Sequence, residues 1–393
     1  MSWFARLCAV LTLFGIGYHL FMLAAALRFF RRTSRWRELP DYVPPVTVLK
    51  PLKGATPELL ANLESFCHQD YPTYQVVFGI DSPDDPAIGV VHRVQRAFPE
   101  RDIVLSIGSG AAVNGKVGTL MQMVEHARHP VLVLSDADIR VTPDYLRTVV
   151  RPLQRERVGL STCFYRGRGR FGLATLFESL CITTDFVPMS FIGNWIGIRA
   201  AYGATIAFKR AALDAAGGFG TAADQLADDY VLGQRVAAAG YELAVLPYVV
   251  DTVLEEDTLG QVWRHQMRWA RTYRACEARG WLLAALIQTT AWACLLWLAT
   301  GGDWPAPQLL GAALGVRLSV LGVIIGLLRD REAALSLWLL PVKDLAMSAI
   351  WVVSWLGREV EWSGQRFRVE ADGRLTRLPA REVPAPSLAA PSP

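Results

Sequence analysis

The feature that most constrains this chain is its apolar N-terminal run. Residues 3–30 are almost continuously apolar, which exceeds the roughly 7–15 residues of a secretory hydrophobic core and is long enough to span a bilayer. The run therefore predicts an uncleaved transmembrane helix over residues 1–30. Because positive charge concentrates on the cytoplasmic side of such helices, the chain after Arg31 is predicted to face the cytoplasm. Arginines cluster at the end of the run: Arg28, Arg31, Arg32, Arg35 and Arg37.

Apolar runs return near the C-terminus. Residues 282–300 and 309–328 are each long enough for a membrane span. A third run, residues 333–356, carries Lys343 and Asp344 near its middle. Because ionisable groups are costly at membrane depth, this run is predicted to be interfacial, re-entrant or a span that faces other helices. The predicted organisation is a transmembrane helix at 1–30, a cytoplasmic domain at 31–280, C-terminal membrane helices at 281–356 and a tail at 357–393.

Composition supports a membrane protein and argues against some partners. Hydrophobic residues make up 52% of the chain and charged residues 19%, against about a quarter charged residues in soluble domains. The net charge of only +4 gives no support to a nucleic-acid partner. No CxxC pair occurs, so neither a zinc site nor a disulfide framework is predicted. The cysteines are interpreted as buried thiols: Cys8, Cys67, Cys163, Cys181, Cys276 and Cys294.

Between the apolar ends, short apolar strands alternate with stretches of helical composition. This alternation predicts an α/β domain with a mostly parallel sheet and helices on both faces. In such sheets, ligands bind beyond the carboxyl ends of the strands. The predicted strands are 46–49, 76–80, 103–107 and 131–134, and the predicted helices are 58–69, 87–98 and 118–127.

Acidic residues follow two of the predicted strands. Asp81 comes directly after the second strand, and Asp136-Ala137-Asp138 follows the fourth. No G-x-G-x-x-G follows the first strand and no Walker-type loop occurs, so phosphate would need another binding mode. Two carboxylates separated by one residue could hold a divalent cation that bridges diphosphate oxygens. The alternative is that they cap the following helix near Thr142.

Three further features allow both a functional and an ordinary structural interpretation. Asp228 and Asp229 open a helix-like stretch, where they could serve catalysis or only stabilise a helix N-terminus. Lys116 lies in a loop before a helix and could meet a phosphate or be a surface lysine. The segment 263–271 is rich in Trp and Arg and could be no more than an anchor at the membrane surface.

Together these clusters resemble the membrane-bound inverting glycosyltransferases that include ceramide glucosyltransferases and their bacterial relatives. That family has three aspartate motifs and then a (Q/R)-x-x-R-W motif before C-terminal membrane helices. The likeness runs from about residue 46 to 271, opens with Lys50-Pro51-Leu52-Lys53-Gly54 and departs at His265, where the family has Gln or Arg. The matching segments are Asp84-Asp85-Pro86-Ala87, Asp136-Ala137-Asp138, Asp228-Asp229-Tyr230 and His265-Gln266-Met267-Arg268-Trp269.

A closer resemblance within that family is to hopanoid-biosynthesis-associated glycosyltransferases, through segments 161–167 and 203–208 and the His-Gln-x-Arg-Trp variant. It implies a GT-A-type, nucleotide-sugar-binding fold and transfer of N-acetylglucosamine from UDP-N-acetylglucosamine to bacteriohopanetetrol. It also implies a multi-pass protein of the bacterial inner (cytoplasmic) membrane whose catalytic domain faces the cytoplasm.

The resemblance also implies roles for individual residues. Asp229 is the expected general base on the acceptor hydroxyl. Asp136 and Asp138 are expected to hold Mg²⁺ or Mn²⁺ on the diphosphate of UDP, and Asp81 and Asp85 are expected near the uridine. The residues expected to close over the diphosphate and the acceptor mouth are Lys116, His265, Arg268 and Trp269.

Other functions stay open at this point. The nearest is a ceramide glucosyltransferase that uses UDP-glucose. A processive polysaccharide synthase shares the motifs but needs a membrane channel, which the few predicted spans disfavour. A non-catalytic membrane scaffold that binds UDP-sugar would show no metal-dependent transfer. For a lipid acceptor, the expected entrance walls are the helix at 263–271 and the third apolar run at 333–356.

Overall fold

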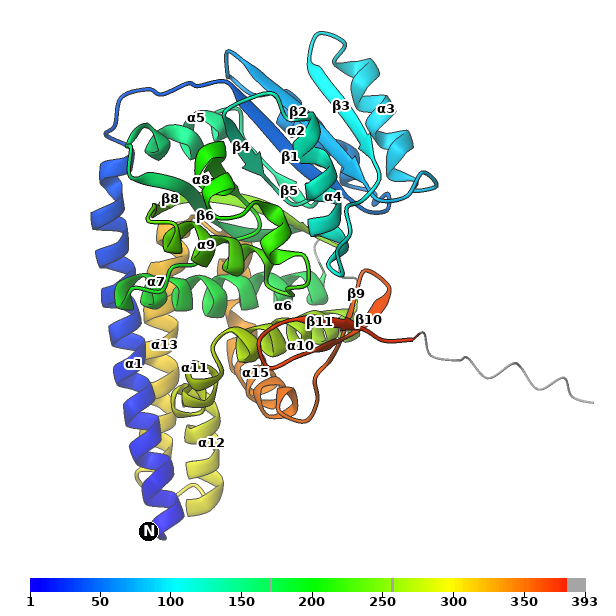
Figure 1. The fold of residues 1–393 in the computed structure, drawn as a ribbon. Coiled ribbons are helices and arrows are strands. Elements are labelled where there is room, and N and C mark those ends of the chain that lie inside the picture. The colour runs from blue at the N-terminus through cyan, green and yellow to red at the C-terminus, as the bar shows by residue number, and fades with distance from the viewer. Residues whose placement is uncertain (170–171, 256–257, 380–393) are drawn as a thin grey trace, which may run out of the picture.

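The computed structural model describes residues 1–169, 172–255 and 258–379. An eight-stranded sheet with flanking helices occupies one end of the molecule, and long helices extend away from it toward the N-terminus (Figure 1). The strands are β1 (Val46–Leu52), β2 (Tyr74–Ile80), β3 (Asp102–Ile107), β4 (Val131–Leu134), β5 (Ile139–Arg140), β6 (Val158–Gly169), β7 (Ile206–Lys209) and β8 (Glu242–Leu254). Their order across the sheet is β3-β2-β1-β4-β7-β6-β8-β5.

The first four strands are those predicted from the sequence, and they pair in parallel. Every residue of β1 and β2 is buried, which explains why these strands appear in the sequence as continuous apolar runs. The sequence analysis did not identify β5 to β8. Of these, β7 is antiparallel to β4 and β6, whereas β8 is parallel to β6 and antiparallel to β5. The predicted α/β class is therefore confirmed, with a mixed second half.

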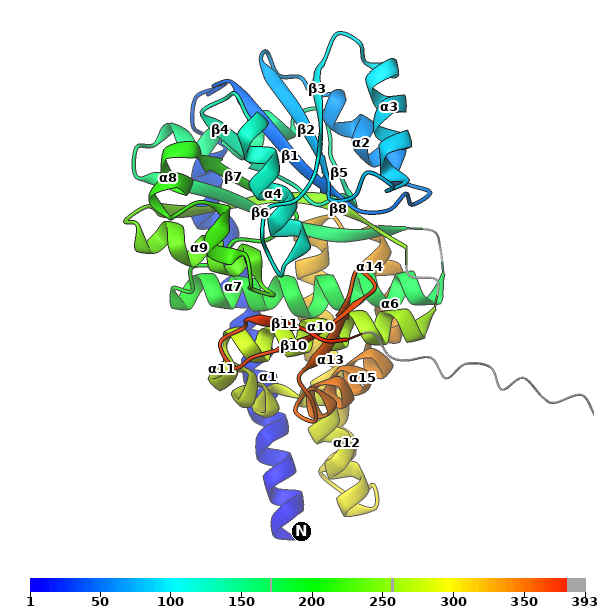
Figure 2. The same ribbon diagram turned by 45° about the vertical axis from the view of Figure 1, so that its right-hand side comes forward.

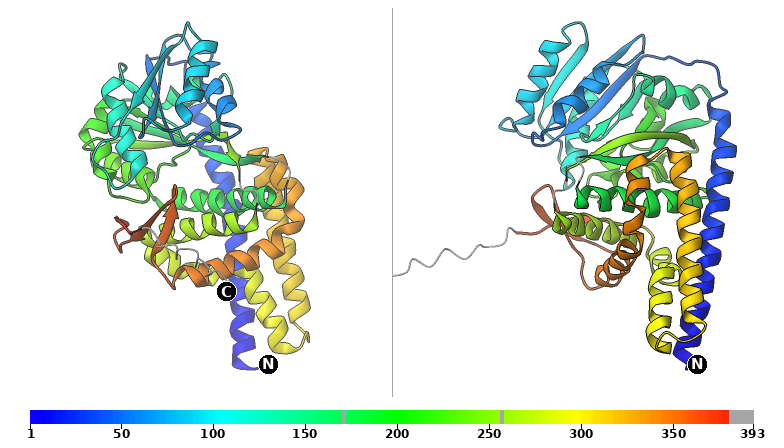
Figure 3. Two further views of the ribbon diagram at one scale, coloured as in Figure 1. Left: turned by 90° about the vertical axis from the view of Figure 1, so that its right-hand side faces the viewer. Right: turned by 180° about the vertical axis from the view of Figure 1, so that it is seen from behind.

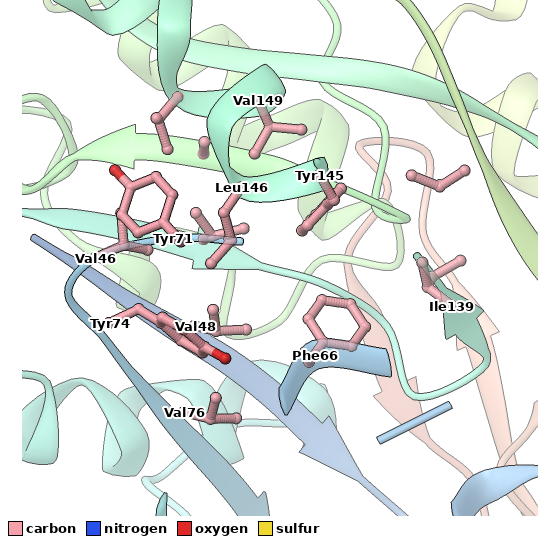
Figure 4. Packing of buried hydrophobic residues seen from close by; sticks show 14 of the residues in the cluster. Val46, Val48, Phe66, Tyr71, Tyr74, Val76, Ile139, Tyr145, Leu146 and Val149 are labelled. Atoms are coloured by element: carbon pink, nitrogen blue, oxygen red, sulfur yellow. The ribbon is translucent and has the colours of Figure 1, made fainter. Parts of the chain in front are cut away.

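Helices cover both faces of the sheet. Because side chains alternate along a strand, Val48 packs on one face and Leu49 on the other. Figure 4 shows the first of these two clusters, in which the rings of Phe66 and Tyr145 meet edge to face at 5.5 Å. One face carries α2 (Leu59–Cys67), α3 (Ala87–Ala97) and α5 (Tyr145–Val150), and the other carries α4 (Gly115–Met123), α8 (Arg210–Ala215) and α9 (Asp228–Ala238).

Two long apolar helices, α1 (Trp3–Thr33) and α13 (Ala306–Leu328), lie side by side and extend beyond the sheet (Figures 1 and 3). The predicted N-terminal helix is thus present. Within the described residues, four helices are long and apolar enough to cross a membrane, or five if one bent pair forms a single span. These four are Trp3–Trp36, Leu173–Ile196, Ala306–Leu328 and Arg331–Ser354.

The run predicted as a span over 282–300 forms a bent pair of helices rather than one straight helix, and its crossing of a membrane stays a prediction. The first part, Ala278–Ile287, meets α12 (Thr289–Thr300) at a bend of 46°. The break is polar, because Thr289 donates a hydrogen bond to the carbonyl of Ile287 and Thr290 donates one to Asp344. Such side-chain hydrogen bonds compete with a continuous helix.

One apolar helix escaped the sequence analysis, because Glu178 and Asp185 interrupt its apolar run. It consists of α6 (Leu173–Cys181), a π-helical turn and α7 (Val187–Ile196), and it lies under the sheet, across the direction of α1 (Figure 2). The remaining long elements are α10 (Leu259–Cys276) and, after a short helix α14 (Arg331–Ser336), α15 (Leu340–Ser354).

The charged residues of the third apolar run all have partners. Lys343 Nζ lies 2.7 Å from Asp185 Oδ1 and 2.9 Å from Asp344 Oδ1. Arg317 Nε of α13 lies 2.6 Å from Asp344 Oδ2. The helix α15 that carries Lys343 lies crosswise to the direction of α1 and α13 (Figure 3). These charges therefore face other helices, and each is paired, which is the condition under which buried charges are tolerated.

The residues predicted as a C-terminal tail contain a second sheet. Its antiparallel strands are β9 (Glu359–Trp362), β10 (Gln365–Val369) and β11 (Leu375–Arg377), with β10 in the centre. Ser363 and Gly364 between the first two have positive φ angles of 52° and 75°, as the commonest two-residue hairpin turn requires. Residues 380–393 of the predicted tail lie outside the described residues.

Candidate functional site

One cavity of about 1010 Å³ brings together nearly all the residues that the sequence analysis singled out. It begins at the carboxyl ends of β1, β2 and β4 and continues between α7 and α10 to α1. The predicted site residues that line it are Asp81, Lys116, Asp136, Asp138, Asp229, His265, Arg268 and Trp269.

Asp136 and Asp138 follow β4, and their side chains meet partners at the cavity wall. Asp136 Oδ1 lies 2.7 Å from Lys116 Nζ, and Asp138 Oδ2 accepts a hydrogen bond from Thr252 Oγ1 at 2.9 Å. The buried Lys50 donates a hydrogen bond to the backbone carbonyl of Asp136 at 2.7 Å and so fixes the turn after the strand. Neither aspartate caps the next helix, α5, so the capping interpretation is wrong.

Asp228 and Asp229 form the first turn of α9 and also face this site. Asp229 Oδ2 accepts a hydrogen bond from the Gly203 N–H at 2.8 Å, and Oδ1 accepts one from the Tyr230 N–H at 2.7 Å. Asp228 Oδ2 lies 3.2 Å from Lys116 Nζ. Lys116 therefore bridges the second and third aspartate motifs and, with 16% of its side chain exposed, is not a surface lysine.

Enclosure in the cavity changes the acidity of these groups. Desolvation, and then the adjacent carboxylate of Asp228, raises the pKa of Asp229 to about 6. Desolvation and the carboxylate of Asp136 raise the pKa of Asp138 to about 6 as well, although this side chain is open to the cavity. Desolvation opposes the charge of Lys116, but the carboxylates of Asp136 and Asp228 outweigh it and raise the lysine's pKa. A carboxyl that titrates near neutral pH suits proton transfer.

Gly203 belongs to the site, although the sequence analysis used it only in a resembling segment. A Cβ atom at this position would lie 3.2 Å from Asp136 Oδ2, 3.3 Å from Asp229 Oδ2 and 3.5 Å from Lys116 Nζ. The glycine therefore allows the backbone to approach the point at which the three charged side chains meet.

The fourth motif lies on α10, opposite the aspartates. The centroid of the Trp269 ring lies 5.0 Å from that of His265 and 5.7 Å from that of Phe186. Arg268 and Trp269 both line the cavity. These side chains therefore face the cavity, and their role there stays a prediction. His265 Nδ1 lies 2.8 Å from Oε1 of Glu178 on α6, a buried residue that contacts the site from behind and that the sequence analysis missed.

Asp81 and Asp85 have different surroundings. Asp81 lines the cavity, whereas Asp85 is not among the described residues that line it. The Asp85 carboxylate accepts hydrogen bonds from the backbone N–H groups of Gly54 at 3.0 Å and Ala87 at 2.8 Å. It thus fixes the segment that carries Lys53, which does line the cavity. Contact of either aspartate with a uridine stays a prediction.

The aspartates fit a divalent cation that is shared with a ligand. In the part of the chain that the structure describes, no group of three or more His, Cys, Asp and Glu side chains could hold a metal ion by itself. Mg²⁺, however, is commonly held by one or two carboxylates together with substrate phosphates. Asp136 and Asp138 offer that donor set at the cavity.

The far end of the cavity is apolar. Helix α10 forms one wall, as expected, but none of residues 333–356, all of which are described, lines the cavity. The third apolar run does not reach the cavity, because α15 packs on the other side of α10. There, Ile350 contacts Met267 and Ala270. The walls come instead from α1, α7 and the turn before α12: Phe14, Tyr18, Met189, Ile192, Ile196, Leu286 and Ile287.

A family model described as glycosyl transferase family 21 matches residues 7–375. The chain belongs to this family. Ceramide glucosyltransferase 1 of Caenorhabditis elegans is 29% identical over 205 residues, which make up 52% of this chain and 44% of that enzyme. The match thus spans less than half the length of this curated relative. The family 21 chain is also 24% identical over 348 residues to a beta-monoglucosyldiacylglycerol synthase of Trichormus variabilis, covering 81% of this chain and 71% of that enzyme.

The fold of this family 21 chain has a counterpart among solved structures. A mannosyltransferase from Pyrobaculum calidifontis, in complex with GDP-Man and Mn2+, matches with a TM-score of 0.52 at 21% sequence identity, covering 89% of this chain and 98% of that chain. The predicted GT-A-type fold and the resemblance to ceramide glucosyltransferase-like enzymes are therefore confirmed. The closer resemblance to hopanoid-associated enzymes stays a prediction.

Proposed function

We propose that this family 21 protein is a membrane-bound inverting glycosyltransferase that transfers a sugar from a nucleoside-diphosphate donor to a hydroxyl group of a lipid. The continuity of the cavity carries this proposal. Asp136 and Asp229 line one end of it, and Phe14 of the apolar helix α1 lines the other. A polar donor and an apolar acceptor can therefore meet inside a single site.

In the proposed reaction, Asp229 takes the proton of the acceptor hydroxyl while its oxygen attacks the anomeric carbon of the sugar. The bond from that carbon to the diphosphate oxygen breaks, the anomeric configuration inverts, and the nucleoside diphosphate leaves. A pKa of about 6 leaves Asp229 ionised and still basic near neutral pH. The hydrogen bond from the Gly203 N–H holds the carboxylate in orientation.

Positive charge around the donor supports departure of the diphosphate. Lys116 and Arg268 both line the cavity, and each can donate charge-assisted hydrogen bonds to phosphate oxygens. A Mg²⁺ or Mn²⁺ ion bound at Asp136 and Asp138 would neutralise further charge on the leaving group.

We further propose bacteriohopanetetrol as the acceptor and UDP-N-acetylglucosamine as the donor, because segments 161–167 and 203–208 resemble hopanoid-associated enzymes. We also propose a multi-pass protein of the bacterial inner membrane, and the arginines after the N-terminal apolar run support a cytoplasmic location for residues 31–280. Ceramide with UDP-glucose is a second candidate pair, which the similarity to Ceramide glucosyltransferase 1 favours.

The test is a transfer assay with the purified full-length protein in detergent and Mg²⁺ or Mn²⁺. Both UDP-sugars are offered with bacteriohopanetetrol and ceramide side by side, and the products are identified by mass. An N-acetylhexosamine adduct on the hopanoid supports the full proposal. A hexose on ceramide supports the reaction and replaces the substrates. A protein that binds UDP but transfers sugar to neither lipid would exclude both proposed substrate pairs and favour a scaffold.

A further inference from the structure

The C-terminal sheet of strands β9–β11 joins three separate walls of the cavity. At its first turn, Lys53 Nζ donates a hydrogen bond to the carbonyl of Ser363 at 3.1 Å. At its second turn, the Leu226 N–H donates to the carbonyl of Gly373 at 3.1 Å. At its first strand, Arg271 of α10 donates to the carbonyl of Glu359. The sheet thus connects the segment after β1, the segment before α9 and the helix of the fourth motif.

One face of this sheet is turned toward the site. Residues two apart on a strand, and residues directly opposite on neighbouring strands, share a face. Trp362 pairs with Gln365, and Phe367 pairs with Arg377, so these four side chains lie on the same face. All four line the cavity. The opposite face carries charged residues such as Arg368, which is exposed.

A small apolar core attaches the C-terminal sheet to the rest of the protein. Val360, Phe367, Val369 and Leu375 form a buried cluster with Leu226. Leu226 lies two residues before Asp228, so the same contact that seats the sheet also supports the start of α9. Residues more than a hundred positions apart in the sequence therefore shape one site.

The polar residues on the inner face suit an anion. Among the described residues, no carboxylate forms an ion pair with Arg377, which leaves its guanidinium available to the cavity. Lys53, at the other contact of the sheet, also lines the cavity. Guanidinium groups bind phosphate oxygens through paired hydrogen bonds, and a tryptophan and an amide beside them can contact a base.

We propose that the C-terminal sheet forms part of the donor site and that Arg377, Trp362 and Gln365 contact the bound nucleoside diphosphate. This inference rests on the proposed function, because it takes a nucleotide sugar as the donor. It assigns binding residues to a segment outside the aspartate motifs and the fourth motif.

The experiment measures UDP affinity by titration calorimetry on the full-length protein in detergent with Mg²⁺. We expect Arg377→Gln to weaken UDP binding about tenfold, as the loss of one charge-assisted hydrogen bond implies. The matched control is Arg368→Gln on the opposite face of β10, which should bind UDP as the unaltered protein does. Equal UDP affinity in the two variants would overturn the inference.

A pair of truncations tests the whole sheet. A chain that ends at Pro379 loses only residues 380–393 and should bind UDP normally, whereas a chain that ends at Leu356 should lose most UDP binding. Retention of UDP binding by the shorter chain would overturn the inference, and if that chain fails to fold, the Arg377 and Arg368 variants decide. The proposed function fails separately, when the full-length protein binds UDP and transfers no sugar.

Discussion

The imidazole Nδ1 of His265 lies 2.8 Å from Oε1 of Glu178, a carboxylate whose side chain has no exposed surface. The same oxygen accepts a hydrogen bond from Gln266 Nε2 at 2.9 Å. Among the described residues, His265 is the one basic side chain within ion-pair distance of Glu178. A buried carboxylate is stabilised by groups that donate to it, and His265 makes this contact at the position where the resembling family has Gln or Arg.

We expect Glu178→Gln to lower kcat for sugar transfer about tenfold, because the negative charge that lies 2.8 Å from the ring is replaced by a neutral amide. His265→Arg should keep most activity, since arginine carries its own charge. The double variant should then lower kcat little more than His265→Arg alone does. The measurement is kcat and KM for the donor in all three variants. An unchanged kcat in Glu178→Gln would show that the carboxylate only fills space.

The proposed general base gives the largest expected effect. Asp229→Asn keeps the shape of the side chain but cannot accept a proton, so transfer should fall by about 10²–10⁴-fold. UDP affinity should change little, because the amide replaces the carboxylate without altering Lys116. Single-turnover transfer and UDP titration measure the two quantities. Asp214→Asn, at an exposed position of α8, is the control, and near-normal transfer by Asp229→Asn would refute the assignment.

The pH dependence follows from the same carboxyl group. A base acts in its ionised form, and the pKa of Asp229 is raised to about 6 by desolvation and by Asp228, with Lys116 and the Gly203 N–H acting in the opposite direction. Activity should therefore be lost as the pH falls through about 6, rather than near the value of about 4 for an ordinary aspartate. The pKa of Asp138 also rises to about 6, so protonation of Asp138 should lower activity over the same pH range. A profile of kcat/KM that stays flat down to pH 5 would exclude Asp229 as the base.

The sequence predicted the parts of the fold that have a strong local signal. Strands β1, β2 and β4 are buried apolar runs, β3 is a partly buried one, and the sequence predicts all four. Strand β6 is not predicted, because its second half carries Tyr165, Arg166 and Arg168 among small residues. The C-terminal sheet does have a signal in the sequence, since apolar and charged residues alternate around Ser363-Gly364, although the sequence analysis predicts only a tail there.

The sequence predicts the site residues that belong to a motif, but not those outside the motifs. Asp136, Asp229 and Trp269 stand in segments that resemble a family, and the structure brings them to one cavity. Glu178 is a lone acid in an apolar stretch, and only the packing of α6 on α10 shows that it reaches a residue 88 positions away. Spatial pairs of this kind leave no trace in the spacing of one sequence.

Gly203 allows a steric test of the site. Gly203→Ala would place a methyl group 3.2–3.5 Å from Asp136, Asp229 and Lys116, so these charged groups must shift by a few tenths of an ångström. Because a misplacement of about 1 Å can cost about 10²-fold in rate, transfer should fall about tenfold with little loss of stability. Gly89→Ala, where no atom lies within 4 Å of the added carbon, is the control. Equal rates in the two variants would mean that the cluster tolerates the shift.

The paired charges of α15 make a prediction about stability rather than catalysis. Lys343 has no exposed surface and lies between Asp185 and Asp344. In Lys343→Met, Arg317 is the one cation among the described residues that still pairs with Asp185 and Asp344. The variant should therefore be destabilised by about 3–5 kcal/mol, the usual cost of breaking a buried ion pair.

A fall in the midpoint of thermal unfolding in detergent measures this loss. Arg331→Met, at an exposed position at the start of α14, should leave the midpoint unchanged. Adding Asp185→Asn to Lys343→Met should recover part of the loss, because it removes the carboxylate that was left without its lysine. If Lys343→Met unfolds at the same temperature as Arg331→Met, the network does not hold α15 in place.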